Sequence, residues 1–160
     1  IAEPIEENIK RIEDFGEIKK MDFDEAIQNG LIKIVGKEID KAYFEKVLSL
    51  ALCDEIDKNI GIIYTPLHGT GGRFVNHVLD KRGFTNYFIV PEQLEPNEEF
   101  PTVSYPNPED LKAFELALKY AREKNADLIL ATDPDADRNA VMVRHGGEYV
   151  PLNGNQREPF

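Results

Sequence analysis

Three aspartates, Asp133, Asp135 and Asp137, stand at alternate positions, and Arg138 follows the last of them. They come directly after the apolar run 128–131, which has the character of a buried strand. Like charges this close raise one another's pKa unless a cation lies among them. Carboxylate oxygens are ligands that Mg²⁺, Ca²⁺ and Mn²⁺ prefer. The cluster therefore predicts a divalent-metal site at the end of a strand.

Other kinds of acidic loop fit the spacing less well or stay open. An EF-hand needs Gly at its sixth position and Glu at its twelfth. Counted from Asp133, those positions hold Arg138 and Arg144. Phosphatases with an aspartyl nucleophile share the pattern as far as Asp135 but have Thr or Val in place of Asp137. On the cluster alone, a metal-dependent glycosyltransferase and a solvated acidic turn both remain alternatives.

The elements that position this loop alternate between strand and helix from residue 60 onward. Strands are predicted at 60–64, 86–90, 128–131 and 140–143, and helices at 73–82 and 108–124. Helices between strands favour a parallel sheet. The acidic loop leaves no room for a crossover, so 140–143 should return antiparallel. We expect an α/β fold, a three-layer α/β/α sandwich with a mostly parallel four-stranded sheet ordered 86–90, 60–64, 128–131, 140–143. A short strand at 149–150 is also indicated.

In that layout a glycine-rich turn, Gly69 to Gly72, meets the acidic loop at the carboxyl edge of the sheet. Glycine permits close backbone approach, and helix N-termini favour anions. Gly69, Gly71 and His68 are therefore candidates for binding a substrate phosphate. The alternatives are a turn that needs glycine for geometry only and a His68 ring that hydrogen-bonds the loop backbone. His77 and His145 are expected at the surface.

The first third of the chain is predicted to be helical with one short strand. The predicted elements are a helix at 3–15, a helix from the N-cap Asp22 to 29–30, a strand at 31–35 and a helix at 40–53 capped by Asp40. Cys53 is the single cysteine, so no internal disulfide can form. It ends an apolar run and is predicted to be a buried structural thiol.

The segment Asp133-Pro134-Asp135-Ala136-Asp137-Arg138 resembles the metal loop of the α-D-phosphohexomutases, the phosphoglucomutase and phosphomannomutase superfamily. That loop is usually Asp-Gly-Asp-Gly-Asp-Arg, and the replacement of both glycines resembles the branch with phosphoglucomutases and phosphopentomutases. Further segments resemble the same branch in the same order, at 64–72, 90–93, 100–109 and 152–156. The resemblance covers roughly residues 37–156.

The resemblance implies one domain of a four-domain enzyme. Family members carry the phosphorylated serine on the first domain, a sugar loop on the third and a phosphate loop on the fourth, and this sequence has none of these segments. Residues 37–156 then correspond to the second, metal-binding domain, and residues 1–36 to lead-in helices from the first. Residues 157–160 form a tail that departs from the family pattern. No nucleophile is expected in this chain.

The implied chemistry interconverts sugar 1-phosphates with 6- or 5-phosphates through a phosphoserine and a bisphosphate intermediate. Mg²⁺ on the three aspartates would take a further ligand from the phosphoserine and neutralise phosphoryl oxygens. Arg138 would orient a carboxylate or the phosphoryl group. The implied partners are the phosphosugar and the other three domains. A glycosyltransferase fragment and a non-catalytic metal-binding module are the alternatives, and the sugar is not specified.

Composition is that of a single globular domain with an acidic surface. The hydrophobic share of 41% and charged share of 31% are ordinary for a globular protein. A net charge of −11 disfavours nucleic acid and anionic membranes as partners. No apolar run approaches the roughly 20 residues that span a bilayer, and no secretory signal pattern opens the sequence. These features predict a cytoplasmic protein.

Overall fold

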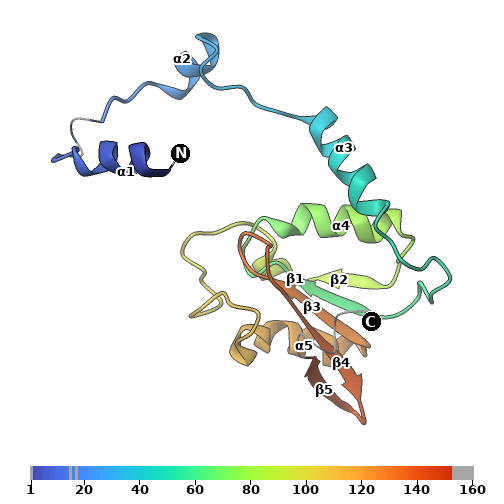
Figure 1. The fold of residues 1–160 in the computed structure, drawn as a ribbon. Helices are drawn as coiled ribbons and strands as arrows, with labels where there is room; N and C mark the ends of the chain where they lie inside the picture. Colours follow the sequence, from blue (N-terminus) through green and yellow to red (C-terminus); the bar gives the residue numbers. More distant parts are fainter. Residues whose placement is uncertain (1, 15, 17, 153–160) are drawn as a thin grey trace. The chain divides into compact units, whose positions relative to one another are not determined.

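The computed structural model describes residues 2–14, 16 and 18–152, and it divides into two compact units, Ile1–Ala42 and Tyr43–Phe160. Figure 1 shows the chain as a ribbon. Its elements, in order, are α1 (Ala2–Lys10), α2 (Phe23–Gln28), α3 (Lys37–Leu48), β1 (Ile62–Thr65), α4 (Gly71–Lys81), β2 (Tyr87–Ile89), η2 (Pro91–Gln93), η3 (Leu111–Phe114), α5 (Glu115–Lys124), β3 (Leu128–Thr132), β4 (Asn139–His145) and β5 (Glu148–Leu152). The segments 153–156 and 157–160 lie outside the described residues.

The sheet of the second unit has the order β2-β1-β3-β4-β5. β1 pairs in parallel with β2 and β3, whereas β4 is antiparallel to both β3 and β5. The predicted order and the antiparallel fourth strand are therefore confirmed. The sheet has one strand more than the predicted four, because the short strand indicated at 149–150 is a full strand, β5, that joins the sheet beside β4. Gly146 and Gly147 have φ of 60° and 90°, which gives the tight two-residue hairpin that pairs β5 with β4.

Helices α4 and α5 lie on opposite faces of the sheet, so the three-layer prediction is confirmed (Figure 1). The main core lies under α5 and joins alternate residues of the strands. It contains Ile63, Val90, Phe114, Ala117, Ala121, Ala126, Ile129, Ala131 and Met142. On the other face Leu128 and Leu130 are half-buried. The prediction that the whole run 128–130 is buried is therefore right for Ile129 alone.

The helices beside the site begin at different residues from those predicted. Helix α4 starts at Gly71 and not at Arg73, and Gly83 follows its C-cap with a φ of 81°. The predicted helix 108–124 is divided, because the short 3-10 turn η3, capped by Asp110, precedes α5. Asn125 ends α5 in the left-handed conformation with a φ of 52°. The site therefore lies beside two helices whose C-terminal ends are well defined.

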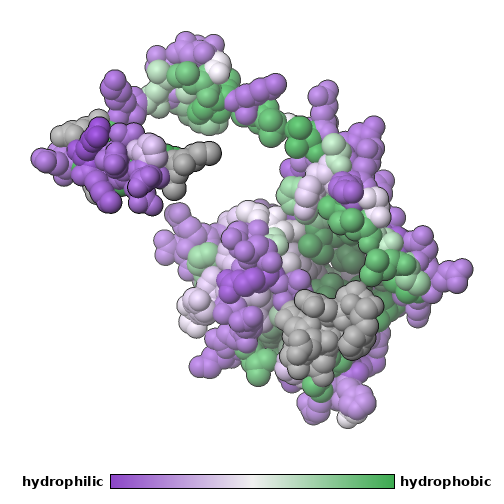
Figure 2. Space-filling model, in the orientation of Figure 1, coloured by the Kyte–Doolittle hydropathy of each residue, from purple (hydrophilic) through white to green (hydrophobic). Residues whose placement is uncertain are grey.

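In the first unit, the cap of α2 is confirmed and the strand is not. The Asp22 carboxylate accepts hydrogen bonds from the backbone amides of Asp24 and Glu25. Segment 31–35 forms no strand, and Leu31 and Ile34 are each 70% exposed. Its apolar side chains stand out in green after α2 in Figure 2. A lone apolar run has no sheet to join there, so its β propensity is not realised. Helix α1 ends at Lys10 and not at residue 15.

Helix α3 is shifted towards the N-terminus relative to its prediction. It starts at Lys37 and ends at Leu48, so Asp40 lies in its first turn and is not its cap. Phe44 is the residue it buries, against Phe74 and His77 of α4. The chain leaves the helix before Cys53, which is exposed, so the prediction of a buried thiol is wrong. Among the described residues, no helix has both the length and the apolar character to cross a membrane.

Candidate metal centre

The acidic loop is held between two paired strands of the sheet. β3 ends at Thr132, which is the register partner of Asn139 at the start of β4. The loop 133–138 therefore closes an antiparallel connection at the carboxyl end of β3. Asp133 is 1% exposed, because it continues directly from the buried strand. Asp135 and Asp137 are exposed, so the cluster has one buried and two solvent-facing carboxylates.

The three carboxylates converge as the sequence predicted. One oxygen from each of Asp133, Asp135 and Asp137 lies within 4.8 Å of the other two. Ligand oxygens about 2.1 Å from Mg²⁺ stand at most about 4.2 Å apart, and Ca²⁺ accepts wider spacing. The observed limit of 4.8 Å exceeds this spacing by about 0.6 Å, and Asp135 and Asp137 are exposed, so their side chains have room to rotate inward. The donor set therefore fits a hard divalent cation such as Mg²⁺.

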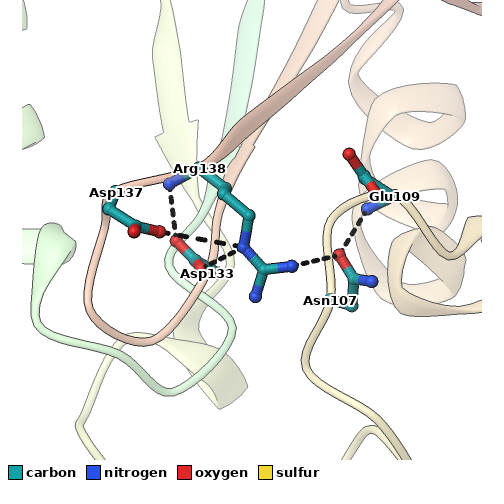
Figure 3. Close-up of polar contacts among 5 residues, drawn as sticks. All are labelled: Asn107, Glu109, Asp133, Asp137 and Arg138. Atoms are coloured by element: carbon teal, nitrogen blue, oxygen red, sulfur yellow. Dashed lines mark hydrogen bonds and ion pairs between the residues drawn. The ribbon is translucent and has the colours of Figure 1, made fainter.

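Arg138 fixes the orientation of the buried carboxylate (Figure 3). Its backbone amide donates to Asp133 Oδ1 at 2.9 Å, and its Nε donates to Asp133 Oδ2 at 2.7 Å. The same Nε lies 3.7 Å from Asp137 Oδ1. Paired, charge-assisted contacts of this kind set geometry as well as energy. The arginine thus aims Asp133 while it balances part of the cluster's charge.

The carboxylates of the cluster titrate in opposite directions. Burial is the largest single influence on Asp133 and raises its pKa, but hydrogen bonds from Arg138, the arginine's charge and a hydrogen bond with Asp135 together hold that pKa below its usual range. The pKa of Asp137 is raised, first by the charge of Asp135 and then by burial and Asp133. The hydrogen bond to Asp133 raises the pKa of Arg138. Without a cation, the repulsion among the three carboxylates therefore disfavours the charged form of Asp137.

Arg138 also connects the acidic loop to the central loop, which is the long segment 94–110 between η2 and η3. Its Nη1 donates to Asn107 Oδ1 at 3.3 Å, and the same oxygen accepts from the Glu109 backbone amide at 3.0 Å. Figure 3 shows Asn107 on the far side of the guanidinium from the aspartates. No local pattern predicts this contact, because Asn107 is 31 residues from Arg138 and the helix it precedes starts later than predicted.

The glycine-rich turn meets the acidic loop, as the predicted layout requires. The backbone amide of Thr70 donates to the Pro134 carbonyl at 2.8 Å. A Cβ on Gly69 would lie 2.3 Å from Pro134 Cα, and one on Gly71 would lie 2.6 Å from the Tyr64 hydroxyl. Glycine is therefore required at both positions for close approach. A role of Gly69 and Gly71 in substrate binding stays a prediction.

His68 is engaged with the central loop. It is 4% exposed, and its Nε2 lies 2.8 Å from the Thr102 hydroxyl. That hydroxyl also accepts from Gln93 Nε2 at 2.9 Å. The expected partner of the ring was the loop backbone, and the observed partner is a side chain. Of the other histidines, His145 is exposed as expected, but His77 is half-buried with its ring stacked at 3.8 Å on Phe44.

Comparison with known proteins identifies relatives among the phosphosugar mutases. The chain is 40% identical over 157 residues to a phosphoglucomutase of Staphylococcus saprophyticus, a match that covers 97% of this chain and 28% of the relative. It is 34% identical over 151 residues to a phosphoribomutase of Saccharomyces cerevisiae, covering 84% of this chain and 24% of the relative. The chain thus spans about a quarter of the length of these curated relatives.

Solved structures show the same fold. A phosphoglucomutase/phosphomannomutase family protein from Burkholderia thailandensis matches with a TM-score of 0.56 at 14% identity, covering 74% of this chain and 26% of that one. Residues 41–147 match the family model described as phosphoglucomutase/phosphomannomutase, alpha/beta/alpha domain II. This range contains the glycine-rich turn, the central loop and the acidic loop. The chain therefore belongs to the phosphoglucomutase/phosphomannomutase family and carries its second, alpha/beta/alpha domain.

Proposed function

We propose that this domain supplies the Mg²⁺ site of a phosphosugar mutase that interconverts sugar 1-phosphates with 6- or 5-phosphates through a phosphoserine and a bisphosphate. The observation that carries the proposal is the convergence of three carboxylate oxygens within 4.8 Å beside Arg138, in a chain of this family. The serine and the sugar-binding loops belong to the other three domains of the longer protein. The metal site is this domain's contribution to the reaction.

The three aspartates of the acidic loop would contribute to cation binding in different ways. Asp133 is buried and fixed by Arg138, so it presents its carboxylate in one orientation. Asp135 and Asp137 are exposed, so they can adjust to the cation and leave its outer side open. When bound, Mg²⁺ stabilises the negative charge that spreads over the oxygens of a transferring phosphoryl group.

Arg138 has a second role in this proposal. Its side chain is 48% exposed although it contacts Asp133, so part of the guanidinium faces solvent beside the acidic loop. Arginine presents five donors in a planar fork that matches phosphate oxygens. It can therefore hold Asp133 through Nε and still orient a phosphoryl group through its terminal nitrogens. Asn107 limits the swing of the guanidinium towards the central loop.

The substrate-binding surface is expected next to the acidic loop. A hollow of about 520 Å³ opens there, and Gly69, Thr70, Phe100 and Pro134 are among the residues that line it. Gly69 and Gly71, with the His68 ring, are the candidate contacts of the substrate phosphate. To contact a phosphate through Nε2, the His68 ring must break its hydrogen bond with Thr102. The relatives named phosphoglucomutase and phosphoribomutase favour the branch that acts on glucose or pentose phosphates.

Metal binding by the 160-residue chain tests the site directly. Titration with Mn²⁺ followed by electron paramagnetic resonance, and with Mg²⁺ by calorimetry, should give a Kd on the order of millimolar, as for sites that keep several waters. Asp135→Asn should abolish this binding and leave the circular dichroism unchanged. Glu148→Gln removes one charge from the exposed first residue of β5 and is the matched control. Equal binding by Asp135→Asn and the parent would refute the assignment.

Turnover tests the reaction. The chain alone should give only background conversion of glucose 1-phosphate with its 1,6-bisphosphate and Mg²⁺ in a coupled assay, because the phosphoserine and sugar loops are not in this sequence. The longer protein that contains this domain should turn over and should lose turnover with Asp135→Asn. Full activity of that variant at ordinary Mg²⁺ would show that the acidic loop is not the catalytic metal site.

A further inference from the structure

Thr70 stands where α4 begins but does not cap that helix. A Thr at this position usually accepts a hydrogen bond from a backbone amide in the first turn. Among the described residues, the Thr70 side chain makes no such bond. Its hydroxyl instead donates to the Pro134 carbonyl at 3.1 Å, and its backbone amide donates to the same oxygen at 2.8 Å. The donor capacity of Thr70 is thus directed at the acidic loop.

The glycines on either side of Thr70 allow this contact. A Cβ on Gly69 would meet the backbone of Pro134 at 2.3 Å. A Cβ on Gly71 would lie 2.6 Å from the Tyr64 hydroxyl and 2.8 Å from Thr132 Oγ1, two atoms that are hydrogen-bonded to each other at 2.9 Å. Thr132 is the residue immediately before Asp133. The turn therefore packs against the acidic loop on both sides of its first carboxylate.

The acidic loop needs such support because its own conformation is unfavourable. Ala136 has a φ of 60°, a left-handed conformation that costs an L-residue about 1–2 kcal/mol. The loop also holds three carboxylates with oxygens within 4.8 Å of one another, and like charges at this spacing repel. The Pro134 carbonyl lies between Asp133 and Asp135, so a contact that fixes it also fixes how these two carboxylates face each other.

We propose that Thr70 is a positioning residue for the metal site: its two hydrogen bonds to the Pro134 carbonyl hold the acidic loop in the conformation in which its carboxylates converge. Gly69 and Gly71 serve the same role by permitting the close approach. The inference rests on the proposed metal function of the loop. It gives the glycine-rich turn a task that does not require contact with the substrate.

Metal affinity separates positioning from a general structural role. Thr70→Val keeps the shape of the side chain and removes the hydroxyl donor, whereas Thr70→Ser restores the donor. Because outer-shell contacts of metal ligands are worth about 10–100-fold in affinity, Thr70→Val should weaken Mn²⁺ binding about tenfold. Thr70→Ser keeps the hydroxyl donor, so its affinity for Mn²⁺ should stay within about twofold of that of the parent. The melting temperatures should differ little, because Thr70 is exposed.

Gly72→Ala is the matched control within the same turn. Its added Cβ would meet the flexible end of Leu94 at 2.8 Å, away from the acidic loop. Gly71→Ala adds the same methyl one residue earlier, against Tyr64 and Thr132. Gly71→Ala should therefore lower Mn²⁺ affinity as Thr70→Val does, and Gly72→Ala should not. Equal losses in both glycine variants would overturn the inference, because they would indicate general disturbance of α4.

Amide hydrogen exchange gives a readout that needs no metal. The amide of Ala136 donates to the Asp133 carbonyl at 3.0 Å, and that of Arg138 donates to Asp133 Oδ1 at 2.9 Å. Both should exchange faster in Thr70→Val, while the amide of Val150 in β5 should be unaffected. Parent-like exchange and Mn²⁺ affinity in Thr70→Val would overturn the inference and leave the metal site intact. A parent chain that binds no Mn²⁺ would overturn both proposals.

Discussion

β3 and the loop that follows it differ in what their residues contribute to folding. In β3, Ile129 and Ala131 are buried in the core under α5. In the loop, one step further along the chain, residues 135–138 are exposed and three carboxylates lie within 4.8 Å of one another. The strand is stabilised by apolar burial. The loop carries like charges and a left-handed Ala136, and both disfavour folding.

The difference shows how a site of high charge density is kept in a folded domain. The charge repulsion and the backbone strain, which both disfavour folding, are confined to the acidic loop. Contacts from neighbouring parts of the structure offset them. These contacts come from Thr70 in the turn before α4, from Asn107 in the central loop and from the neighbouring Thr132–Asn139 strand pair. Such local cost is typical of functional sites and is tolerated when the surrounding core supplies stability.

The largest effect is expected in the strand. Ile129→Asp places an unpaired charge in the core under α5, where the native side chain is 0% exposed. It should lower the free energy of unfolding by several kcal/mol, roughly 3–5, or unfold the domain. Val150→Asp in β5, at a side chain 42% exposed, is the control and should cost much less. Urea denaturation measures both, and equal losses would show that the core is not under α5.

The next effect is expected at the buried end of the loop. Asp133→Asn removes the charge that Arg138 contacts twice and should cost roughly 1–3 kcal/mol in the metal-free chain. The pKa of Asp133 is lowered by folding, so its stabilisation is present above the unfolded-state value of about 3.9 and is lost as the pH falls through the lowered value.

Stability profiles against pH check this prediction. Asp133→Asn should flatten the acid limb of the profile relative to the parent. Asp54→Asn is the control, because it breaks the ion pair with Arg82 at a carboxylate 85% exposed, and such a pair is worth less than about 1 kcal/mol. An acid limb in Asp133→Asn as steep as that of the parent would contradict the role given to Arg138.

A smaller gain is expected from relief of backbone strain in the loop. Ala136→Gly removes the left-handed penalty of about 1–2 kcal/mol but adds the chain entropy of glycine, about 0.5–1 kcal/mol. The net result should be a rise of up to about 1.5 kcal/mol in the free energy of unfolding. Ala140→Gly, in β4 with ordinary backbone geometry, should lower it. Thermal denaturation distinguishes the two signs, and destabilisation by Ala136→Gly would show that the loop is not strained there.

The smallest effect concerns charge repulsion. In the metal-free chain, Asp135→Asn should raise the melting temperature by about 1 °C, because the charge of Asp135 is the first cause of the raised pKa of Asp137. The raised pKa means that charged Asp137 opposes folding above it and that protonation removes the repulsion below it. The gain should therefore be present at neutral pH and vanish in acid. A lower melting temperature at pH 7 would contradict the loop's repulsive character.

Predictions from the sequence were accurate where a local rule decides the outcome. The Asp22 cap, the C-terminal end of the helix predicted at 73–82 and the order of the first four strands were all obtained from local pattern and connection rules. Predictions failed where a partner distant in sequence decides. Segment 31–35 has strand composition but no strand to pair with, and the run that ends at Cys53 leaves α3 without reaching a core.

The sequence by itself determined that three aspartates follow a strand and that a glycine-rich turn follows its neighbour, because alternation and chain order are local properties. Only the tertiary structure decided which side chains hold those aspartates in place. Asn107 and Thr70 are far from the loop in sequence and reach it because the parallel pairing of β1 with β3 brings their segments to one edge of the sheet. Such contacts leave no periodic trace in the chain, since each depends on how separate elements pack.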